Sequence, residues 1–352
     1  MSDKIWNVAA ENRAMASTFA ALGGLWTSYQ LYKVLSFSYL HFVRPSALKR
    51  FKKNKPGSTS SSSWALITGA SDGIGRGFAE ELCNRGFNVV LHGRNEKKLN
   101  GVKDDLLKQW PDREIRLLII DAGAEPFDLA GIEAAPEQLK DLNLRILINN
   151  VGGSGGAKPI FKPLAECGSD RSRLFLDINA RFTTEITRIL LPLLYKNGPA
   201  VVLNVGSFVC DIAAPYLSLY SGAKAYGKAW SRSLDLEMRA EGHDVEVIHV
   251  NVGEVSTAAL QRPTSFFVPS ARRMAKDSLD KIGCGEPLVF GYWPHYLHYL
   301  AMSITPRWIA EWLVLRIAKE LQADELKEIQ FCEKTTKGEE DIVPSLARPE
   351  KS

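Results

Sequence analysis

The 352-residue sequence predicts an α/β protein built on a doubly wound parallel β-sheet. Two observations support this prediction. Short apolar runs alternate along the chain with longer segments of helical periodicity, the pattern of buried parallel strands joined by crossover helices. A glycine-rich stretch also joins the first apolar run to the first helical segment. The expected strands are 65–68, 87–92, 115–121, 144–150, 200–205 and 245–252, and the expected helices are 75–85, 95–109, 171–196 and 217–241.

Ahead of the first strand lies an uncharged segment, residues 14–32, whose length is close to that needed to cross a bilayer. Ser, Thr, Gly and Gln interrupt it, so an interfacial helix, or a helix folded onto the main domain, stays an alternative to a membrane anchor. A block of basic residues without an acid follows, between Arg44 and Lys55. Because positive flanks face the cytosol, we expect a single N-terminal anchor with everything beyond residue 44 in the cytosol.

Composition divides the chain into consecutive segments. A tail with the anchor (1–43) and a basic, Ser-rich linker (44–63) precede the α/β domain (64–285). An apolar and aromatic stretch (286–320) then predicts an amphipathic helical extension, which lies either at a bilayer or on the core. The remaining residues (321–352) form a charged tail.

Charge and cysteine usage argue against several kinds of site. The net charge of +4 is small for this length and does not predict a nucleic-acid partner. The five cysteines are scattered without a Cys-x-x-Cys pair, and the six histidines show no metal-ligand spacing. We therefore expect neither a disulfide framework nor a metal site.

The stretch TGASDGIG, residues 68–75, lies between the first strand and the first helix. Gly69 permits a tight turn, Gly73 lets the backbone approach a pyrophosphate, and Gly75 lets helix and strand pack closely. The helix N-terminus adds unpaired N–H groups and a positive dipole end, so we predict a Rossmann-type dinucleotide site. The residues that this stretch contributes are Gly69, Ser71, Asp72, Gly73, Ile74 and Gly75.

The ends of the next strands predict which dinucleotide is bound. Arg94 follows the second strand, where an NAD enzyme carries an acidic residue for the ribose 2′-hydroxyl. A guanidinium pairs with a 2′-phosphate, so NADP(H) is the expected cofactor, although an arginine here can also be a solvated strand-end residue. Asp121 ends the third strand, where its carboxylate can accept from the adenine amino group. The residues expected beside the ribose, after the fourth strand, are Asn149, Asn150 and Gly152.

Together with Ser207, Tyr220 and Lys224, these motifs occur in the order and spacing of the short-chain dehydrogenase/reductases. Ser207 precedes Tyr220 by thirteen residues, and Lys224 follows Tyr220 by one helical turn. Asn179 matches the fourth catalytic position of that family. The sequence resembles the family over residues 64–260.

Softer features resemble one branch of the family. They are the uncharged segment near the N-terminus, the stretch FVRPSALKRF at 42–51 and the stretch GYWPHYLHYL at 291–300. They are similar to the membrane-bound 3-ketoacyl-CoA reductases of very-long-chain fatty acid elongation and the related 17β-hydroxysteroid dehydrogenases. This wider resemblance extends over about residues 15–320.

The resemblance implies a role for four side chains in reducing a carbonyl with hydride from NADPH. Tyr220 protonates the alkoxide, while the charge of Lys224, with that of an oxidised nicotinamide, lowers the pKa of the phenol. Lys224 also holds the nicotinamide ribose hydroxyls. Ser207 polarises the carbonyl, and Asn179 positions a water that links Lys224 to solvent. Each also has an ordinary alternative: Ser207 as a loop cap, Asn179 as a helix-interior residue, and Tyr220 as a packing residue with its hydroxyl at the surface.

The loop after the sixth strand departs from the family pattern. Val252-Gly253 stands where the family has Pro-Gly, so we expect a less rigid loop. Val255 and Thr257 still match positions that contact the nicotinamide carboxamide and phosphate. Residues 263–283 are expected to form a lid, whose basic side chains either meet the phosphates of a CoA thioester or are solvated. Those side chains are Arg272, Arg273 and Lys276.

We therefore expect an NADPH-dependent enzyme of the endoplasmic reticulum membrane that reduces a long or very-long-chain 3-oxoacyl-CoA to the 3-hydroxyacyl form. A steroid, or a specialised lipid or polyketide ketone, is the alternative substrate, and an inactive membrane scaffold is the non-enzyme alternative. The expected partners are the apolar substrate and the membrane, and a homodimer or an association with other membrane lipid-synthesis enzymes stays open. The loops at 151–164 and 256–285 shape the pocket, so motifs do not name the ketone.

Overall fold

The computed structural model describes residues 2–52, 62–258, 260 and 262–342, leaving out the side chains of 2–11, 14 and 332–342. The chain forms two compact units, Met1–Ser46 and Ala47–Ser352.

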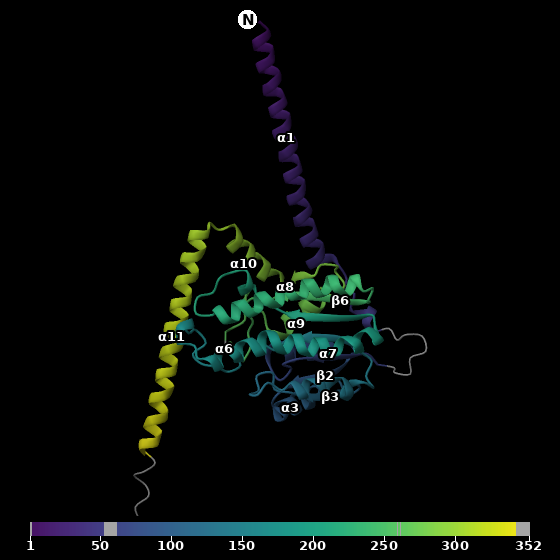
Figure 1. The fold of residues 1–352 in the computed structure, drawn as a ribbon, viewed down its shortest axis with the longest axis vertical. Coiled ribbons are helices and arrows are strands. Elements are labelled where there is room, and N and C mark those ends of the chain that lie inside the picture. Colours follow the sequence, from purple (N-terminus) through teal and green to yellow (C-terminus); the bar gives the residue numbers. More distant parts are fainter. Residues whose placement is uncertain (1, 53–61, 259, 261, 343–352) are drawn as a thin grey trace, which may run out of the picture. The chain divides into compact units, whose positions relative to one another are not determined.

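The first unit is one long helix, α1 (Ser2–Ser38), which ends in a π-helical turn, η1 (Tyr39–Val43) (Figure 1). Large apolar side chains such as those of Phe19 and Leu25 are exposed along it. Ser, Thr, Gly and Gln dilute these apolar residues. Across the described residues, no helix combines the length and the apolar character that a membrane span requires. The expected span over residues 14–32 is therefore not confirmed.

The second unit is built on a parallel sheet, with the described strands in the order β3-β2-β1-β4-β5-β6-β7 (Figure 1). The strands are β1 (Trp64–Ile67), β2 (Asn88–Gly93), β3 (Ile115–Ile119), β4 (Leu144–Asn149), β5 (Ala200–Val205), β6 (Val245–Asn251) and β7 (Leu288–Phe290). The chain order reverses between β1 and β4, which opens a crevice at the carboxyl ends of these two strands. The predicted doubly wound parallel sheet is confirmed.

Strands β1 to β6 lie within two residues of the ranges expected from the sequence. Strand β7 has no signal in the sequence, because its three residues lie inside an aromatic stretch and show no strand periodicity. Its pairing with β6, for example His249 with Leu288 and Asn251 with Phe290, depends on the fold alone. The sheet therefore extends past residue 285, where the composition placed the end of the domain.

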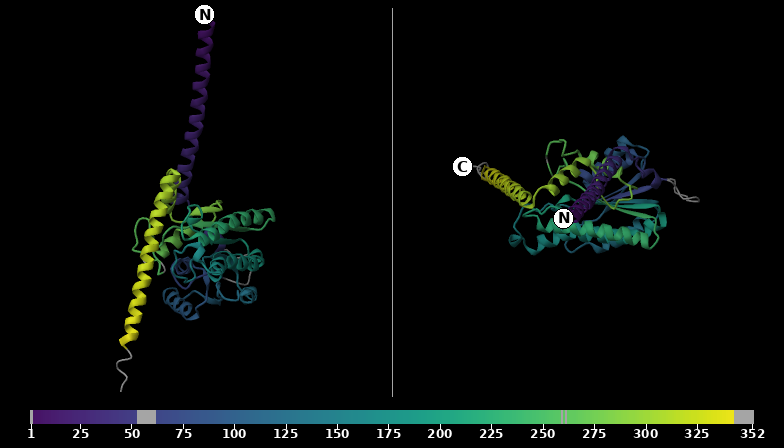
Figure 2. Two further views of the ribbon diagram at one scale, coloured as in Figure 1. Left: turned by 60° about the vertical axis from the view of Figure 1, so that its left-hand side comes forward. Right: turned by 90° about the horizontal axis from the view of Figure 1, so that it is seen from above.

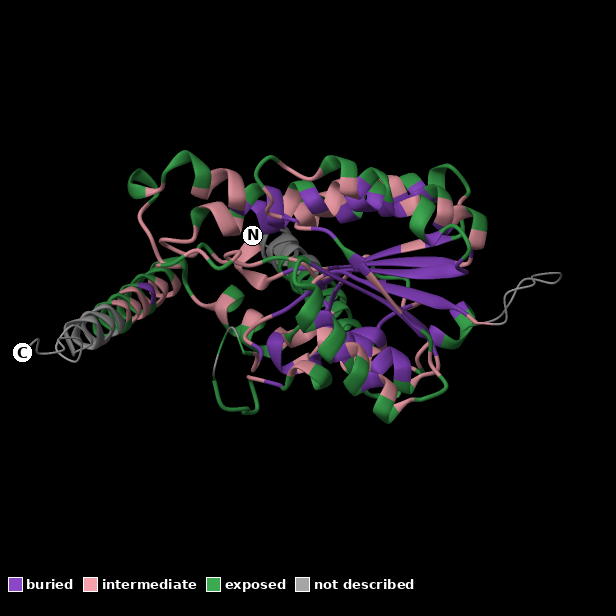
Figure 3. Cartoon of the chain, turned by 90° about the horizontal axis from the view of Figure 1, so that it is seen from below, coloured by how far each residue is buried: buried purple, intermediate pink, exposed green. Residues whose placement is uncertain are grey.

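Helices cover both faces of the buried sheet (Figure 3). One group contains α2 (Gly73–Asn84), α3 (Glu96–Gln109) and α9 (Ala271–Leu279), and the other contains α4 (Leu129–Glu133), α5 (Ala135–Leu139), α7 (Phe182–Asn197) and α8 (Ser218–Ala240). The expected single helix over 171–196 is in fact composite. It consists of α6 (Ser169–Leu176), a π-helical turn η4 (Asp177–Arg181) and α7 in unbroken succession.

One part of the core lies between the sheet and α7. Leu66, Leu147 and Val202 come from three neighbouring strands and form a buried cluster with Phe182 and Leu190. Because the strands are buried on both faces, their sequences read as nearly continuous apolar runs, which is why they were predictable. Phe182 is fully buried, so truncating it to alanine would cost about 3–5 kcal/mol of stability.

After β7 the chain continues into α10 (Trp293–Ile304) and α11 (Arg307–Ile342) (Figure 2). Helix α11 holds the loop between β4 and α6. The Glu325 carboxylate accepts from the backbone N–H groups of Ile160 (2.6 Å) and Phe161 (3.0 Å). Gln322 Nε2 donates to the Phe161 carbonyl oxygen (3.3 Å). This helix continues beyond residue 320, where the composition predicts the start of a charged tail.

Candidate active site

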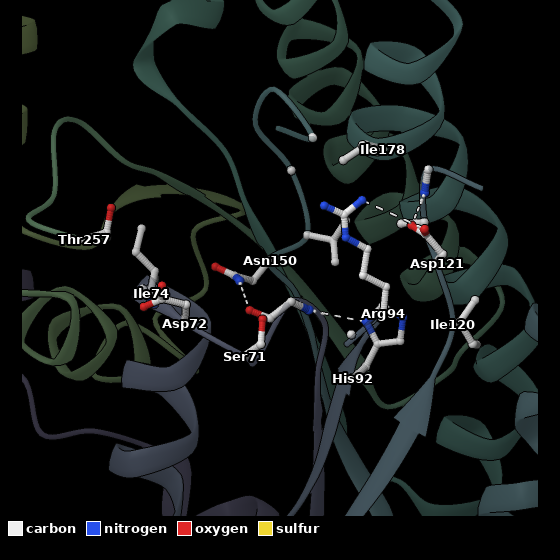
Figure 4. A pocket seen from close by; sticks show the side chains of 18 residues that line it. Ser71, Asp72, Ile74, His92, Arg94, Ile120, Asp121, Asn150, Ile178 and Thr257 are labelled. Carbon is white, nitrogen blue, oxygen red and sulfur yellow. Dashed lines mark hydrogen bonds and ion pairs between the residues drawn. The ribbon is translucent and has the colours of Figure 1, made fainter. Parts of the chain in front are cut away.

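A cavity of about 380 Å3 opens where the carboxyl ends of β1 to β4 meet (Figure 4). Many of the predicted cofactor residues line it, namely Gly69, Ser71, Asp72, Gly73, Ile74, Arg94, Asp121, Asn150, Gly152 and Thr257. Gly75, Asn149 and Val255 are also near the strand ends but do not line it; Asn149 and Val255 are buried. The crevice predicted from the strand order is therefore present.

The glycine stretch forms a tight turn into α2. Gly69 has φ of 66° and Gly73 has φ of 55°, the left-handed region that favours glycine. A Cβ on Gly75 would lie 2.1 Å from the Gly69 carbonyl oxygen, so helix and turn approach as closely as glycine permits. The Asp72 side chain caps α2 by accepting from the Gly73 N–H (2.6 Å). The N-terminus of α2 therefore faces the cavity with its positive dipole end.

Arg94 and Asp121 lie side by side at the ends of β2 and β3 (Figure 4). Arg94 Nη1 is 4.0 Å from Asp121 Oδ2, and the Arg94 side chain is 60% exposed. Asp121 Oδ1 also accepts from the Gly123 N–H (3.0 Å). A loosely paired, exposed guanidinium at the cavity rim is free to bind a phosphate with little rearrangement.

Further residues line the cavity without having been predicted, namely His92, Gly93, Ile120, Ala122, Gly123, Val151, Gly155 and Ile178. Gly93 ends β2 and Ile120 follows β3, so the same strand-end argument could have identified these two. His92 is fully buried, and burial lowers its pKa to about 4. Its Nδ1 accepts a hydrogen bond from the Gly69 N–H (3.4 Å), and this bond supports the glycine turn.

Ser207, Tyr220 and Lys224 come together next to this cavity. Ser207 begins the loop after β5, where its Oγ accepts from the Val209 N–H (3.4 Å). Tyr220 and Lys224 lie one turn apart in α8, and Tyr220 is hydrogen-bonded to Ser207. Lys224 Nζ is 5.7 Å from the centre of the Tyr220 ring and donates to the Val205 carbonyl oxygen (3.1 Å).

Asn179 reaches the same place from the π-helical turn η4. Its Oδ1 accepts from the Gly153 N–H (2.8 Å), and its Nδ2 donates to the carbonyl oxygens of Gly153 and Phe175 (both 2.9 Å). A Cβ added to Gly152 would lie 2.9 Å from Asn179 Oδ1 and 3.0 Å from Lys224 Nζ. The amide and the ammonium therefore flank Gly152 closely, and the π-helical turn that makes this possible has no signature in the sequence.

Burial determines the pKa values of the tyrosine and the lysine. Burial raises the pKa of Tyr220, and the hydrogen bond with Ser207 offsets this only in part. Burial lowers the pKa of Lys224 to about 8. In the cofactor-free protein the pKa of Tyr220 is therefore raised, and its lowering by Lys224 together with an oxidised nicotinamide stays a prediction. The pKa is raised because desolvation disfavours the phenolate, while the ammonium is directed at Val205.

The basic side chains expected in the lid are paired with acids. Arg273 contacts Asp277 (2.8 Å), Lys276 contacts Asp280 (3.1 Å), and Arg272 lies 3.8 Å from Glu81. They belong to α9, which packs against α2 on one face of the sheet. These pairs favour the interpretation as helix surface charges over that of a CoA-phosphate site.

The family described as short chain dehydrogenase matches residues 63–265. A very-long-chain 3-oxoacyl-CoA reductase of Neurospora crassa is 30% identical over 332 residues, covering 91% of this chain and 94% of that protein. Among solved structures, a 7β-hydroxysteroid dehydrogenase has a TM-score of 0.62 at 18% identity, covering 73% of this chain and 96% of that one. A short-chain dehydrogenase of Sphingobium yanoikuyae in complex with NADPH has a TM-score of 0.55 at 22% identity, covering 70% and 97%. The chain therefore belongs to the short-chain dehydrogenase family, in the branch of the very-long-chain 3-oxoacyl-CoA reductases, and is an oxidoreductase that uses a nicotinamide dinucleotide.

Proposed function

We propose that this protein reduces long or very-long-chain 3-oxoacyl-CoA to the 3-hydroxyacyl form with NADPH, and that Tyr220 is the proton donor. The observation that carries the proposal is the meeting of Tyr220 with Ser207 and Lys224 at the edge of the dinucleotide cavity. The name of the Neurospora crassa relative, which aligns along nearly the whole chain, supports the substrate class.

The residues around the cavity fit NADP(H). The turn from Gly69 to Gly75 and the N-terminus of α2 would hold the pyrophosphate, because a Cβ at Gly75 has no room and the backbone is correspondingly close. Arg94 would pair with the 2′-phosphate, and Asp121 would accept from the adenine amino group. The residues that would contact the nicotinamide ribose and carboxamide are Asn150, Gly152, Lys224 and Thr257, whereas Asn149 and Val255 are buried beside the cavity. When bound, this cofactor supplies the hydride.

The protein's own groups would handle the proton. The raised pKa keeps Tyr220 a neutral phenol at neutral pH, which is the form that can protonate an alkoxide. Ser207 would hydrogen-bond the substrate carbonyl and hold Tyr220 beside it. A small cavity is lined by both Lys224 and Asn179, and it would hold the water through which a proton returns to Tyr220.

A second cavity of about 550 Å3 supports a long apolar substrate. The loop between Ser207 and Tyr220 forms one wall, through Ile212 and Pro215, and α10 and α11 form the other, through Met302 and Val314. An extended acyl chain attached to a carbonyl at Tyr220 would be shielded there from water.

We also propose that the protein associates with the endoplasmic reticulum membrane through α1. Exposed apolar side chains such as Phe19, Leu25 and Trp26 support contact of α1 with a bilayer. Vesicle flotation of the full chain, compared with a chain lacking residues 2–38, would measure this. Equal flotation of the two would contradict the proposal.

The decisive experiment offers the purified protein NADPH with a long-chain 3-oxoacyl-CoA and, separately, a steroid ketone. We expect kcat/KM to favour the thioester by ~100-fold or more, the discrimination that several additional buried methylenes provide. A preference for the steroid would overturn the substrate, and reduction of neither would favour an inactive scaffold. Tyr220→Phe is expected to abolish turnover while leaving NADPH binding nearly intact, and surviving turnover would disprove the mechanism.

A further inference from the structure

His295 lies at the start of α10 and is almost completely buried, with 1% of its surface exposed. Its Nδ1 accepts from the Gly253 N–H (3.1 Å). Its Nε2 is 3.1 Å from the carbonyl oxygens of both Glu254 and Phe267. Carbonyl oxygens only accept, so Nε2 carries the proton and Nδ1 is the unprotonated acceptor. Both ring nitrogens are therefore fully engaged by the backbone of two separate loops.

The first of these loops is the cofactor loop, which we define as residues 252–257. It follows β6 and brings Thr257 to the wall of the dinucleotide cavity. This is the loop in which Val252 replaces the proline expected from the family pattern. By bonding the N–H of Gly253 and the carbonyl of Glu254, His295 fixes the two peptide groups that flank the pair Gly253-Glu254.

Gly253 is also enclosed by side chains. A Cβ at this position would lie 2.5 Å from the Phe208 ring and 2.9 Å from the His295 ring. Phe208 directly follows Ser207 in the chain, so the cofactor loop is packed between α10 and the segment that carries this serine. The imidazole therefore takes over the restraint that the missing proline would have provided.

The second loop is the cover segment, which we define as residues 263–270, between the cofactor loop and α9. His295 donates to the Phe267 carbonyl, and Tyr292 Oη donates to the Phe266 carbonyl (3.0 Å). The Phe266 ring also packs edge-on against Trp293, with ring centres 5.3 Å apart. Phe266 and Phe267 are about half exposed, so this segment presents an apolar surface whose backbone is held by α10.

We propose that His295 is a positioning residue that joins the cofactor loop to the cover segment, which makes the C-terminal helix α10 part of the active site. The proposal rests on the proposed NADP(H) site. Through one imidazole, the loop that would contact the nicotinamide and the segment on the substrate side share a single support. Loss of the bond to Gly253 would disturb the cofactor loop, whereas loss of the bond to Phe267 would release the cover segment.

Two conservative variants separate these contacts. The side-chain oxygen of asparagine reaches the place of Nδ1, and the side-chain amide of glutamine reaches the place of Nε2. His295→Asn keeps an acceptor for Gly253, and His295→Gln keeps a donor for Glu254 and Phe267. His295→Ala removes all three bonds, leaving buried backbone groups unpaired. His298→Ala is the control, because His298 is exposed on the same helix and contacts Phe208 and Phe267 only through ring packing.

The measurements are the NADPH dissociation constant by fluorescence titration, KM and kcat for the ketone, and the melting temperature. We expect His295→Ala to weaken NADPH binding by ~10-fold or more, the effect of leaving a buried polar group unpaired. His295→Asn should retain most of the NADPH affinity but raise KM for the ketone, and His295→Gln should do the reverse. His298→Ala should change NADPH binding less than 3-fold, about the scatter of surface substitutions.

Equal losses of melting temperature in all three His295 variants, without the split between NADPH affinity and ketone KM, would overturn the proposal and leave His295 as a packing residue. Unchanged NADPH affinity in His295→Ala would overturn it as well. If the unaltered protein bound NADPH but reduced no ketone, the proposed function would fail. The NADPH dissociation constants of the His295 variants would still decide the role of His295. A protein that bound no nicotinamide cofactor would overturn both.

Discussion

Lys224 Nζ donates to the carbonyl oxygen of Val205 at 3.1 Å, at the end of β5. This bond directs the ammonium into a buried position where its pKa falls to about 8, because burial disfavours its charge. The neighbouring Tyr220 moves the other way, to a raised pKa, for the same reason. Within one helical turn, desolvation therefore makes the Lys224 ammonium easier to deprotonate and the Tyr220 phenol harder to deprotonate.

The pH profile of ketone reduction should reflect this pair. We expect kcat/KM to fall as pH rises through about 8, because Lys224 loses its charge, while Tyr220 stays protonated throughout. Lys224→Arg keeps a charge above pH 8, so its residual activity should lack this decline. A profile that is flat from pH 6 to 10 in the unaltered protein would contradict the assignment.

Gly152 separates the side chains of Asn179 and Lys224. In Gly152→Ala, the added Cβ would meet Asn179 Oδ1 at 2.9 Å and Lys224 Nζ at 3.0 Å, so one of the two groups has to move. We expect kcat to fall by ~10- to 100-fold, since displacements of this size strongly affect positioned catalytic groups. Gly101→Ala, in α3 with no atom within 4 Å of the added Cβ, is the control and should leave kcat unchanged. Equal activity of the two variants would count against a catalytic role for this cluster.

Arg94 should decide between NADP(H) and NAD(H). Its guanidinium is exposed at the cavity rim and only loosely paired with Asp121, at 4.0 Å. Arg94→Ala is expected to raise the dissociation constant of NADPH by ~10- to 100-fold, because hydrogen bonds to a charged group contribute about that much to affinity. The dissociation constant of NADH should change little. Titration with both cofactors measures the ratio. Equal weakening for NADPH and NADH would mean that Arg94 does not contact the 2′-phosphate.

The protein should lose stability in mild acid. Burial lowers the pKa of His92, His249 and His295 from 6.5 to about 4 in the folded state. Between these pH values the unfolded chain binds more protons, so stability falls as pH falls from about 6.5 towards 4 and is unaffected by these groups above pH 7. Each group contributes roughly 1 kcal/mol per pH unit. Denaturant titrations across this range measure the slope, which His249→Gln should reduce; an unchanged slope would contradict the prediction.

The second cavity should set the length of acyl chain accepted. Ala310 of α11 lines it, so Ala310→Phe would fill part of the 550 Å3. We expect kcat/KM to fall for the longest 3-oxoacyl-CoA and to change little for short ones. Ala323→Phe, at an exposed position of the same helix, is the matched control. Equal losses for every chain length would place the acyl chain elsewhere.

The local patterns in the sequence were enough for the sheet and for much of the cavity. Strands such as β4 and β5 are buried on both faces and therefore appear as apolar runs, and the residues after them lie at one edge. Gly69, Gly73 and Gly75 between a strand and a helix are also recognised from their spacing within a few residues of the chain. These features depend on residues close together in the chain, which a single sequence displays directly.

The doubly wound parallel sheet, the dinucleotide turn and the candidate residues Ser207, Tyr220 and Lys224 follow from the sequence alone. The direction of Lys224 towards Val205 and the support of Gly253 by His295 appear only in the folded chain. It also added β7, whose three residues pair with β6. Burial and contacts between residues far apart in the chain produce these features, and neither is encoded in a local pattern.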